Sequence, residues 1–212
     1  DNDIMYSSHI YNGFFAIVNT ANKSNPVLVT TQQTPGNFTH NTWRSGNTLF
    51  TTDEVANSYL TSFDITNTSN IVQLDKIQSN PGANSIVHNT FILNDYAITS
   101  WYKDGFTIVD VSRPANMVQV GNYDTYPNGS GNGFQGCWGV YPFLPSGNIL
   151  AANISKEVVN TQGIGDFGFE KALRKIALEY INPVIRTKEI AKLMKGHTIA
   201  EIIEVLDMIP IT

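Results

Sequence analysis

A period of 45 to 49 residues runs through most of this 212-residue chain. An Asn or Asp that follows a short apolar run occurs at Asn19, Asp64 and Asp110, at intervals of 45 and 46 residues. A His-Asn-Thr-aromatic phrase begins at His40 and again 48 residues later at His88, and a degenerate copy begins at Cys137 after 49 more. Two independent markers with one period indicate a structural repeat. A four-stranded β-propeller blade takes roughly 40 to 50 residues, so each repeat is interpreted as one blade.

Short apolar segments lie between these markers and are separated by clusters of Asn, Gly, Pro and Ser. Their β-branched and aromatic residues favour extended backbone, and the flanking residues favour turns. The predicted strands include Phe15–Val18, Val27–Thr31, Thr48–Thr52, Ile71–Leu74, Tyr96–Trp101, Thr107–Val111 and Met117–Val120. The sequence therefore predicts a mainly β fold, in which residues 1–155 form a propeller-like array of about three to four four-stranded blades.

The number of repeats predicts an incomplete ring. Closed propellers have roughly four to eight blades, and an open arc leaves unpaired strand edges. The chain begins at Asp1, with neither a methionine nor a signal peptide. We therefore expect a C-terminal portion of a longer propeller, a processed product, or an arc that another chain completes.

Residues 156–212 differ from the rest of the chain in composition. Residues 1–155 hold 10 acidic and five basic residues, a net charge of −5, whereas residues 156–212 hold eight of each. From residue 167 the apolar positions follow the i, i+3, i+4, i+7 spacing of a helix face. We predict a linker at 156–166 and a small α-helical segment of about three short helices at 167–212.

One stretch carries a family resemblance. Asp104–Pro127, which contains Asp-Gly-Phe-Thr-Ile-Val-Asp-Val-Ser, resembles the LVIVD-repeat propellers. With His88-Asn89 before it and Trp138–Asn148 after it, the chain is similar to the choice-of-anchor B family of bacterial extracellular proteins. The resemblance covers about residues 5–155. It implies a secreted or surface-attached β-propeller, exported from a bacterial cell, whose biochemical role is largely undefined.

Composition excludes several classes of protein. No window approaches 18 consecutive apolar residues, so no membrane span is predicted. The net charge is −5 without a basic cluster, which argues against nucleic-acid binding. The single cysteine, Cys137, excludes an internal disulfide framework and is interpreted as a small buried hydrophobe. Neither a Gly-x-Ser-x-Gly nor a His-Glu-x-x-His motif occurs, so no catalytic residue is predicted.

Two histidines occupy equivalent repeat positions. In a propeller, equivalent positions of His40 and His88 lie around the central channel. Together with the carboxylate of Asp53, the two imidazoles would make a divalent metal site. The sequence favours a different interpretation, in which each His-Asn pair fixes a recurrent turn through hydrogen bonds to backbone and no cofactor is needed. In the same way, the repeated Asn or Asp at 19, 64 and 110 is predicted to cap turns.

The candidate ligand-binding residues combine these histidines with aromatic residues near the same repeat position. They are His40, Trp43, His88, Trp101, Tyr102, Trp138 and Tyr141. Exposed aromatic faces beside Asn and Asp side chains are typical of carbohydrate and peptide sites. The alternative is that these aromatic side chains pack between blades.

Three functional hypotheses follow from these observations. The leading one is a non-enzymatic binding or adhesion module, extracellular or at the cell surface, for a glycan, peptide or protein partner. The second is a metal-dependent hydrolase or lyase that uses the repeat-equivalent histidines. The third is a structural subunit that self-associates, or joins another chain, through open blade edges and the helical tail.

Overall fold

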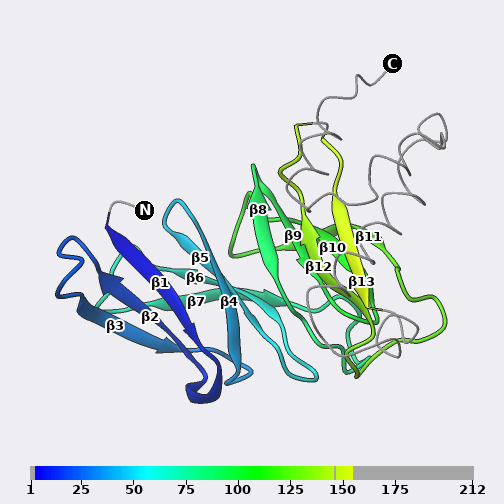
Figure 1. Cartoon of the computed structure of the whole chain (residues 1–212), viewed down its shortest axis with the longest axis horizontal. Coiled ribbons are helices and arrows are strands. Elements are labelled where there is room, and N and C mark those ends of the chain that lie inside the picture. Colours follow the sequence, from blue (N-terminus) through cyan, green and yellow to red (C-terminus); the bar gives the residue numbers. More distant parts are fainter. Residues whose placement is uncertain (1–2, 146, 155–212) are drawn as a thin grey trace, which may run out of the picture.

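The computed structural model describes residues 3–145 and 147–154, which form 13 strands and one short 3-10 helix (Figure 1). The strands are β1 (Ile4–His9), β2 (Phe14–Asn19), β3 (Val27–Gln33), β4 (Thr39–Ser45), β5 (Thr48–Asp53), β6 (Leu60–Asp64), β7 (Val72–Ile77), β8 (Thr90–Leu93), β9 (Tyr96–Ser100), β10 (Phe106–Asp110), β11 (Val118–Tyr123), β12 (Gly136–Tyr141) and β13 (Leu150–Ile154). The 3-10 helix η1 (Ile10–Asn12) joins β1 to β2. The predicted linker and helical tail at 156–212 lie outside the described residues.

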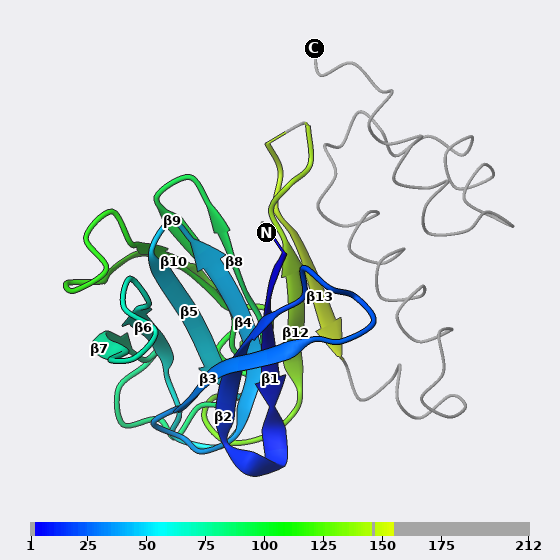
Figure 2. The same ribbon diagram turned by 90° about the vertical axis from the view of Figure 1, so that its left-hand side faces the viewer.

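The strands form four antiparallel sheets in chain order. These are β1-β2-β3, β4-β5-β6-β7, β8-β9-β10-β11 and β12-β13. Each sheet is a simple meander, because every strand pairs with its neighbour in sequence. The predicted mainly β, propeller-like array is therefore confirmed, with four strands in two of the four described sheets. In Figure 2, β4 and β8, the first strands of the two four-stranded sheets, run side by side.

The predicted repeat is present in the turns. The backbone N–H two residues after each marker donates to the marker's side-chain oxygen. These bonds are Ala21 N to Asn19 Oδ1 (2.9 Å), Thr66 N to Asp64 Oδ1 (2.8 Å) and Ser112 N to Asp110 Oδ1 (2.9 Å). The predicted capping role is confirmed. The side-chain hydroxyls of Thr66 and Ser112, together with these backbone N–H groups, hold the pKa of Asp64 and of Asp110 below the usual range, because hydrogen bonds to a carboxylate favour its ionised form.

A β-bulge precedes each of these turns. The register between neighbouring strands shifts at Ile17/Val18, Ser62/Phe63 and Ile108/Val109. Each shift lies in the two residues directly before the Asn or Asp marker. A bulge bends its strand and increases the local twist. The β-bulge therefore recurs with the same period as the Asn or Asp marker.

The core lies between successive sheets. One cluster joins the two four-stranded sheets and contains Phe50, Leu60, Val87, Ile92, Ala97, Trp101, Val109, Val111 and Met117. A second cluster joins the first sheet to the second and contains Phe15, Ile17, Leu49, Phe63 and Ile65. Burying a side chain such as Leu or Phe contributes about 1.5–3 kcal/mol, so these face-to-face contacts stabilise the array of blades. Among residues 3–145 and 147–154, none belongs to a helix long and apolar enough to cross a membrane.

Candidate functional site

The site lies where β4 and β8 begin. His40 is the second residue of β4, and His88 precedes β8 by two residues. The Asn41 side chain, next to His40, accepts a hydrogen bond from the backbone N–H of Thr90 (3.1 Å). The hydroxyl of Thr52, in β5, donates to the His88 carbonyl oxygen. These bonds hold the starts of the two blades together, so the two imidazoles meet.

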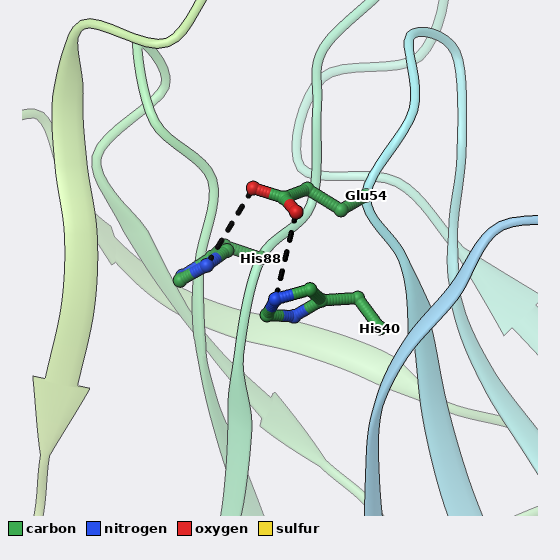
Figure 3. Close-up of side chains that lie close together, drawn as sticks. All are labelled: His40, Glu54 and His88. Carbon is green, nitrogen blue, oxygen red and sulfur yellow. Dashed lines mark ion pairs between the residues drawn. The ribbon is translucent and has the colours of Figure 1, made fainter. Parts of the chain in front are cut away.

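The Glu54 carboxylate faces both imidazoles (Figure 3). Nε2 of His40 is 3.5 Å from Oε2 of Glu54, and Nε2 of His88 is 3.6 Å from Oε1 of the same side chain. The two imidazole ring centroids are 4.5 Å apart. One ligand atom from each of the three residues lies within 4.8 Å of the other two. We call these three residues the His–Glu–His cluster.

His88 is the more enclosed of the two histidines, with a side chain that is 4% exposed. Its Nδ1 bonds the backbone carbonyl oxygen of Trp138, which only accepts, so we assign the ring proton to Nδ1. Burial, with the nearby His40 imidazole, lowers the pKa of His88 to about 4, although the hydrogen bond to Trp138 acts in the opposite direction. At neutral pH His88 is therefore uncharged, and its Nε2 presents a lone pair to Glu54.

His40 has a different environment. Its side chain is 22% exposed, and its Nδ1 is buried without a hydrogen-bond partner among the described residues. Nε2 faces Glu54. The two equivalent imidazoles therefore differ in accessibility, since His88 is held at the back of the cluster and His40 lies nearer to solvent.

Tyr102 also contacts the Glu54 carboxylate. Its hydroxyl donates to Oε1 of Glu54. Burial is the main cause that raises the pKa of Tyr102 well above its usual range, and the hydrogen bond to Glu54 and its charge add to the effect. The hydroxyl therefore stays protonated and remains a donor. Tyr102 also adopts a φ of +46°, a left-handed conformation that is unusual for an aromatic residue and is often found at functional sites.

The structure corrects the predicted acidic residue of the metal site. The Asp53 carboxylate is completely buried and accepts hydrogen bonds from the Thr34 hydroxyl, the Gly36 N–H (3.0 Å) and the Phe38 N–H (3.1 Å). It fixes the loop between β3 and β4. The acid that faces the histidines is Glu54, the next residue along the chain. Sequence reasoning missed it, although the adjacent pair of acids was a usable signal.

The aromatic candidates do not form one surface. Trp101 is completely buried in the core, and its Nε1–H donates to Thr107 Oγ1 (2.9 Å), so it offers no face to a ligand. Tyr102 is also buried and contributes only its hydroxyl. Trp138 is 38% exposed, and its ring lies 5.3 Å from that of His88.

Trp43 and Tyr141 belong to a separate aromatic group. Trp43 stacks on Phe143 with a centroid separation of 5.5 Å, and Tyr141 meets Phe143 edge to face at 5.6 Å. Each lies three residues further along its strand than His40 or Trp138. Of the seven predicted residues, the structure therefore gathers His40, His88, Tyr102 and Trp138 at one place. It adds Phe134, which is 56% exposed and lies edge to face on Tyr102 at 5.1 Å.

A match to a known repeat family agrees with this organisation for one blade. Residues 87–125 match the LVIVD repeat. The match begins one residue before His88 and spans all four strands of the β8–β11 sheet, so one LVIVD repeat corresponds to one blade. The LVIVD repeat that the sequence resemblance indicated is therefore confirmed for residues 87–125. None of the curated proteins matches the chain significantly.

Three solved structures are similar to the chain at low identity. A "putative 6-phosphogluconolactonase" from Bacteroides fragilis has a TM-score of 0.47 and 10% identity, with 57% of this chain and 36% of that chain covered. The N-terminal domain of Nup159 has a TM-score of 0.42 and 11% identity, with coverage of 59% and 33%. A protein from Lactobacillus plantarum has a TM-score of 0.40 and 10% identity, with coverage of 73% and 62%. The chain thus spans less than two thirds of each of these structures.

Proposed function

We propose that this β-propeller repeat protein is a non-enzymatic binding module whose ligand, a glycan, peptide or protein, contacts the starts of β4, β8 and β12. The observation that carries the proposal is the position of Trp138, which is 38% exposed beside His88 and the His–Glu–His cluster. Phe134, which packs edge to face on Tyr102, is a second exposed aromatic ring near the cluster.

The chemistry of this surface suits a ligand with both apolar and polar groups. Exposed aromatic rings supply flat apolar contact at low entropic cost, and the neighbouring groups of His40 and Glu54 supply hydrogen bonds. Both of these side chains are partly exposed, so a ligand on Trp138 would reach them without rearranging the blades. A sugar ring, with one apolar face and a rim of hydroxyls, fits this combination well.

The test is a binding screen of the full chain against immobilised glycans and peptides, followed by titration of any hit. Trp138→Ala is expected to weaken binding by at least about 10-fold, because the central aromatic contact is lost. The matched control is Tyr141→Ala, which removes a similarly exposed aromatic residue from the same strand but from the separate group around Phe143. Equal losses in both variants, or no hit on either array, would overturn the proposal.

The His–Glu–His cluster supports a second candidate, the metal-dependent hydrolase or lyase. Two imidazoles and one carboxylate are a ligand set that catalytic zinc sites use. The discriminating assay is turnover of p-nitrophenyl esters and phosphates with added zinc. Turnover that Glu54→Gln abolishes would favour the enzyme over the binding module.

The proposal also includes the localisation of the protein. The resemblance to choice-of-anchor B proteins and the scarcity of lysine in residues 1–155 support export to the cell surface or medium. Fractionation of cells that express the tagged protein tests this.

Self-association through blade edges stays a prediction that mass measurement in solution checks, and a monomer at all concentrations would contradict it.

A further inference from the structure

From the geometry of the His–Glu–His cluster we infer that His40, His88 and Glu54 bind a divalent transition-metal ion, with zinc as the preferred ion. The ligand atoms are Nε2 of each imidazole and one carboxylate oxygen of Glu54. The inference concerns the same surface as the proposed function. Metal binding is measured without any glycan or peptide, however, so the two fail separately.

The distances fit a tetrahedral ion. Zinc lies about 2.0–2.1 Å from nitrogen and oxygen ligands, which places two ligands of a tetrahedral site about 3.3 Å apart. Nε2 of His40 lies 3.5 Å from Oε2 of Glu54, and Nε2 of His88 lies 3.6 Å from the other oxygen, Oε1, so either oxygen starts near this separation from one imidazole. All three ligand atoms lie within 4.8 Å of one another, so small side-chain rotations would bring them to a common ion.

The hydrogen bonds leave one ring nitrogen of His88 for an ion. Nδ1 of His88 bonds the Trp138 carbonyl oxygen. The other ring nitrogen, Nε2, lies 3.6 Å from Oε1 of Glu54. Imidazole nitrogen and carboxylate oxygen are both zinc ligands, so an ion coordinated by these two atoms would join the two side chains.

The surrounding groups orient the ligands. Metal-binding histidines usually donate their second ring N–H to a carbonyl or carboxylate, as His88 does to Trp138. The Tyr102 hydroxyl holds the Glu54 carboxylate in a similar way. Through Thr52 and Asn41, hydrogen bonds between the blades fix the backbone on either side of the imidazoles. The ligands are thus held before any ion arrives.

The ligand types select the class of metal. Imidazole suits zinc, copper, iron and nickel, whereas calcium and magnesium take oxygen ligands and need about six of them. Three protein ligands leave a fourth position of a tetrahedral site open. His40 is the ligand nearest to solvent, so the open position would be on its side, where water or a ligand group could coordinate.

The experiment is calorimetric titration of the full chain, after chelator treatment and buffer exchange, with Zn²⁺, Co²⁺, Mg²⁺ and Ca²⁺ as separate probes. We expect one Zn²⁺ per chain at micromolar or lower Kd, and no heat with Mg²⁺ or Ca²⁺. Co²⁺ should give the strong visible absorption of a tetrahedral site.

The variants locate the ion. His40→Ala and Glu54→Gln should each weaken Zn²⁺ binding by at least about 100-fold. His9→Ala is the control, because His9 stacks on Phe14 outside the cluster. Circular dichroism confirms that each variant is folded. Absence of stoichiometric Zn²⁺ binding by the folded wild-type chain would overturn the inference. So would Zn²⁺ binding by His40→Ala and Glu54→Gln that is as tight as that of the wild-type chain.

Discussion

The two complete blades carry different side chains at equivalent positions, and the differences build the site. An offset of 48 residues superimposes the strand pairing of β4–β5 on that of β8–β9, since Thr42 pairs with Thr51 and Thr90 with Thr99. By this offset Glu54 corresponds to Tyr102, and the two side chains are hydrogen-bonded to each other. His40 likewise corresponds to His88, and their rings are neighbours.

The comparison shows how a repeat becomes a site. Identical residues at a repeat position, as with the histidines, place like groups side by side. Different residues, as with Glu54 and Tyr102, place an acceptor against a donor. Asp53 and Trp101 are also equivalent, yet one fixes a loop and the other fills the core. Repetition supplies the backbone positions, and divergence between blades supplies the chemistry.

The largest expected effect is on stability, and it distinguishes the buried Trp101 from the partly exposed Trp138. Trp101→Ala should lower the free energy of unfolding by about 3–5 kcal/mol, because it removes a completely buried ring from the core between blades. Trp138→Ala should cost about 1 kcal/mol or less, since its side chain is partly exposed. Urea denaturation followed by circular dichroism measures both. Similar losses for the two variants would contradict the assignment of Trp101 to the core.

The next effect distinguishes the two histidines. His88→Ala should destabilise the fold by about 2–3 kcal/mol, because it leaves a small cavity and removes one of the two hydrogen bonds to the Trp138 carbonyl oxygen, the other coming from the Ser100 hydroxyl (3.3 Å). His40→Ala should cost about 1 kcal/mol or less, since Nδ1 has no hydrogen bond to lose among the described residues. Denaturation in chelator-treated buffer makes the comparison. Equal costs would show that the two environments are alike.

Cys137 provides a third comparison, because it stands where the first two copies carry histidine. It is buried against Ile98 and Val140, and burial raises the pKa of its thiol to about 12. At pH 8 the folded protein should therefore react with a disulfide reagent at least about 100-fold more slowly than the unfolded protein, because the thiolate is scarce and enclosed. The rate of thiol modification, followed by absorbance with and without urea, gives the ratio. A rapid reaction of the folded chain would contradict the burial of Cys137.

The smallest effect concerns the turn markers. The folded pKa of Asp64 lies below its ordinary value of 3.8, so its contribution to stability is present above pH 3.8 and is lost as pH falls through the folded pKa. Asp64→Asn should leave stability at pH 7 nearly unchanged, because Asn19 makes the same bond in the first repeat. It should remove that part of the acid sensitivity. Thermal melts between pH 2 and pH 7 test this, and an unchanged pH profile would contradict it.

Much of the fold could be predicted from local sequence. The short runs before Asn19, Asp64 and Asp110 form strands, and each strand ends in a turn that this Asn or Asp caps. The first strands of the blades carry a weaker signal. Polar His, Asn and Thr residues open β4 and lead into β8, and some of them form hydrogen bonds between blades, such as the one from the Thr90 N–H to the Asn41 side chain. The convergence of His40 and His88 followed from the repeat itself.

The sequence by itself determined the period, the β class, the capped turns and the pairing of equivalent histidines, because these depend on local preference and on repetition. Only the tertiary structure decided that Glu54 and not Asp53 faces them, and that Trp138 reaches solvent while Trp101 does not. Adjacent residues of a strand point to opposite sides. Which side meets the neighbouring blade is settled by how the blades pack, and no local pattern in the chain records that choice.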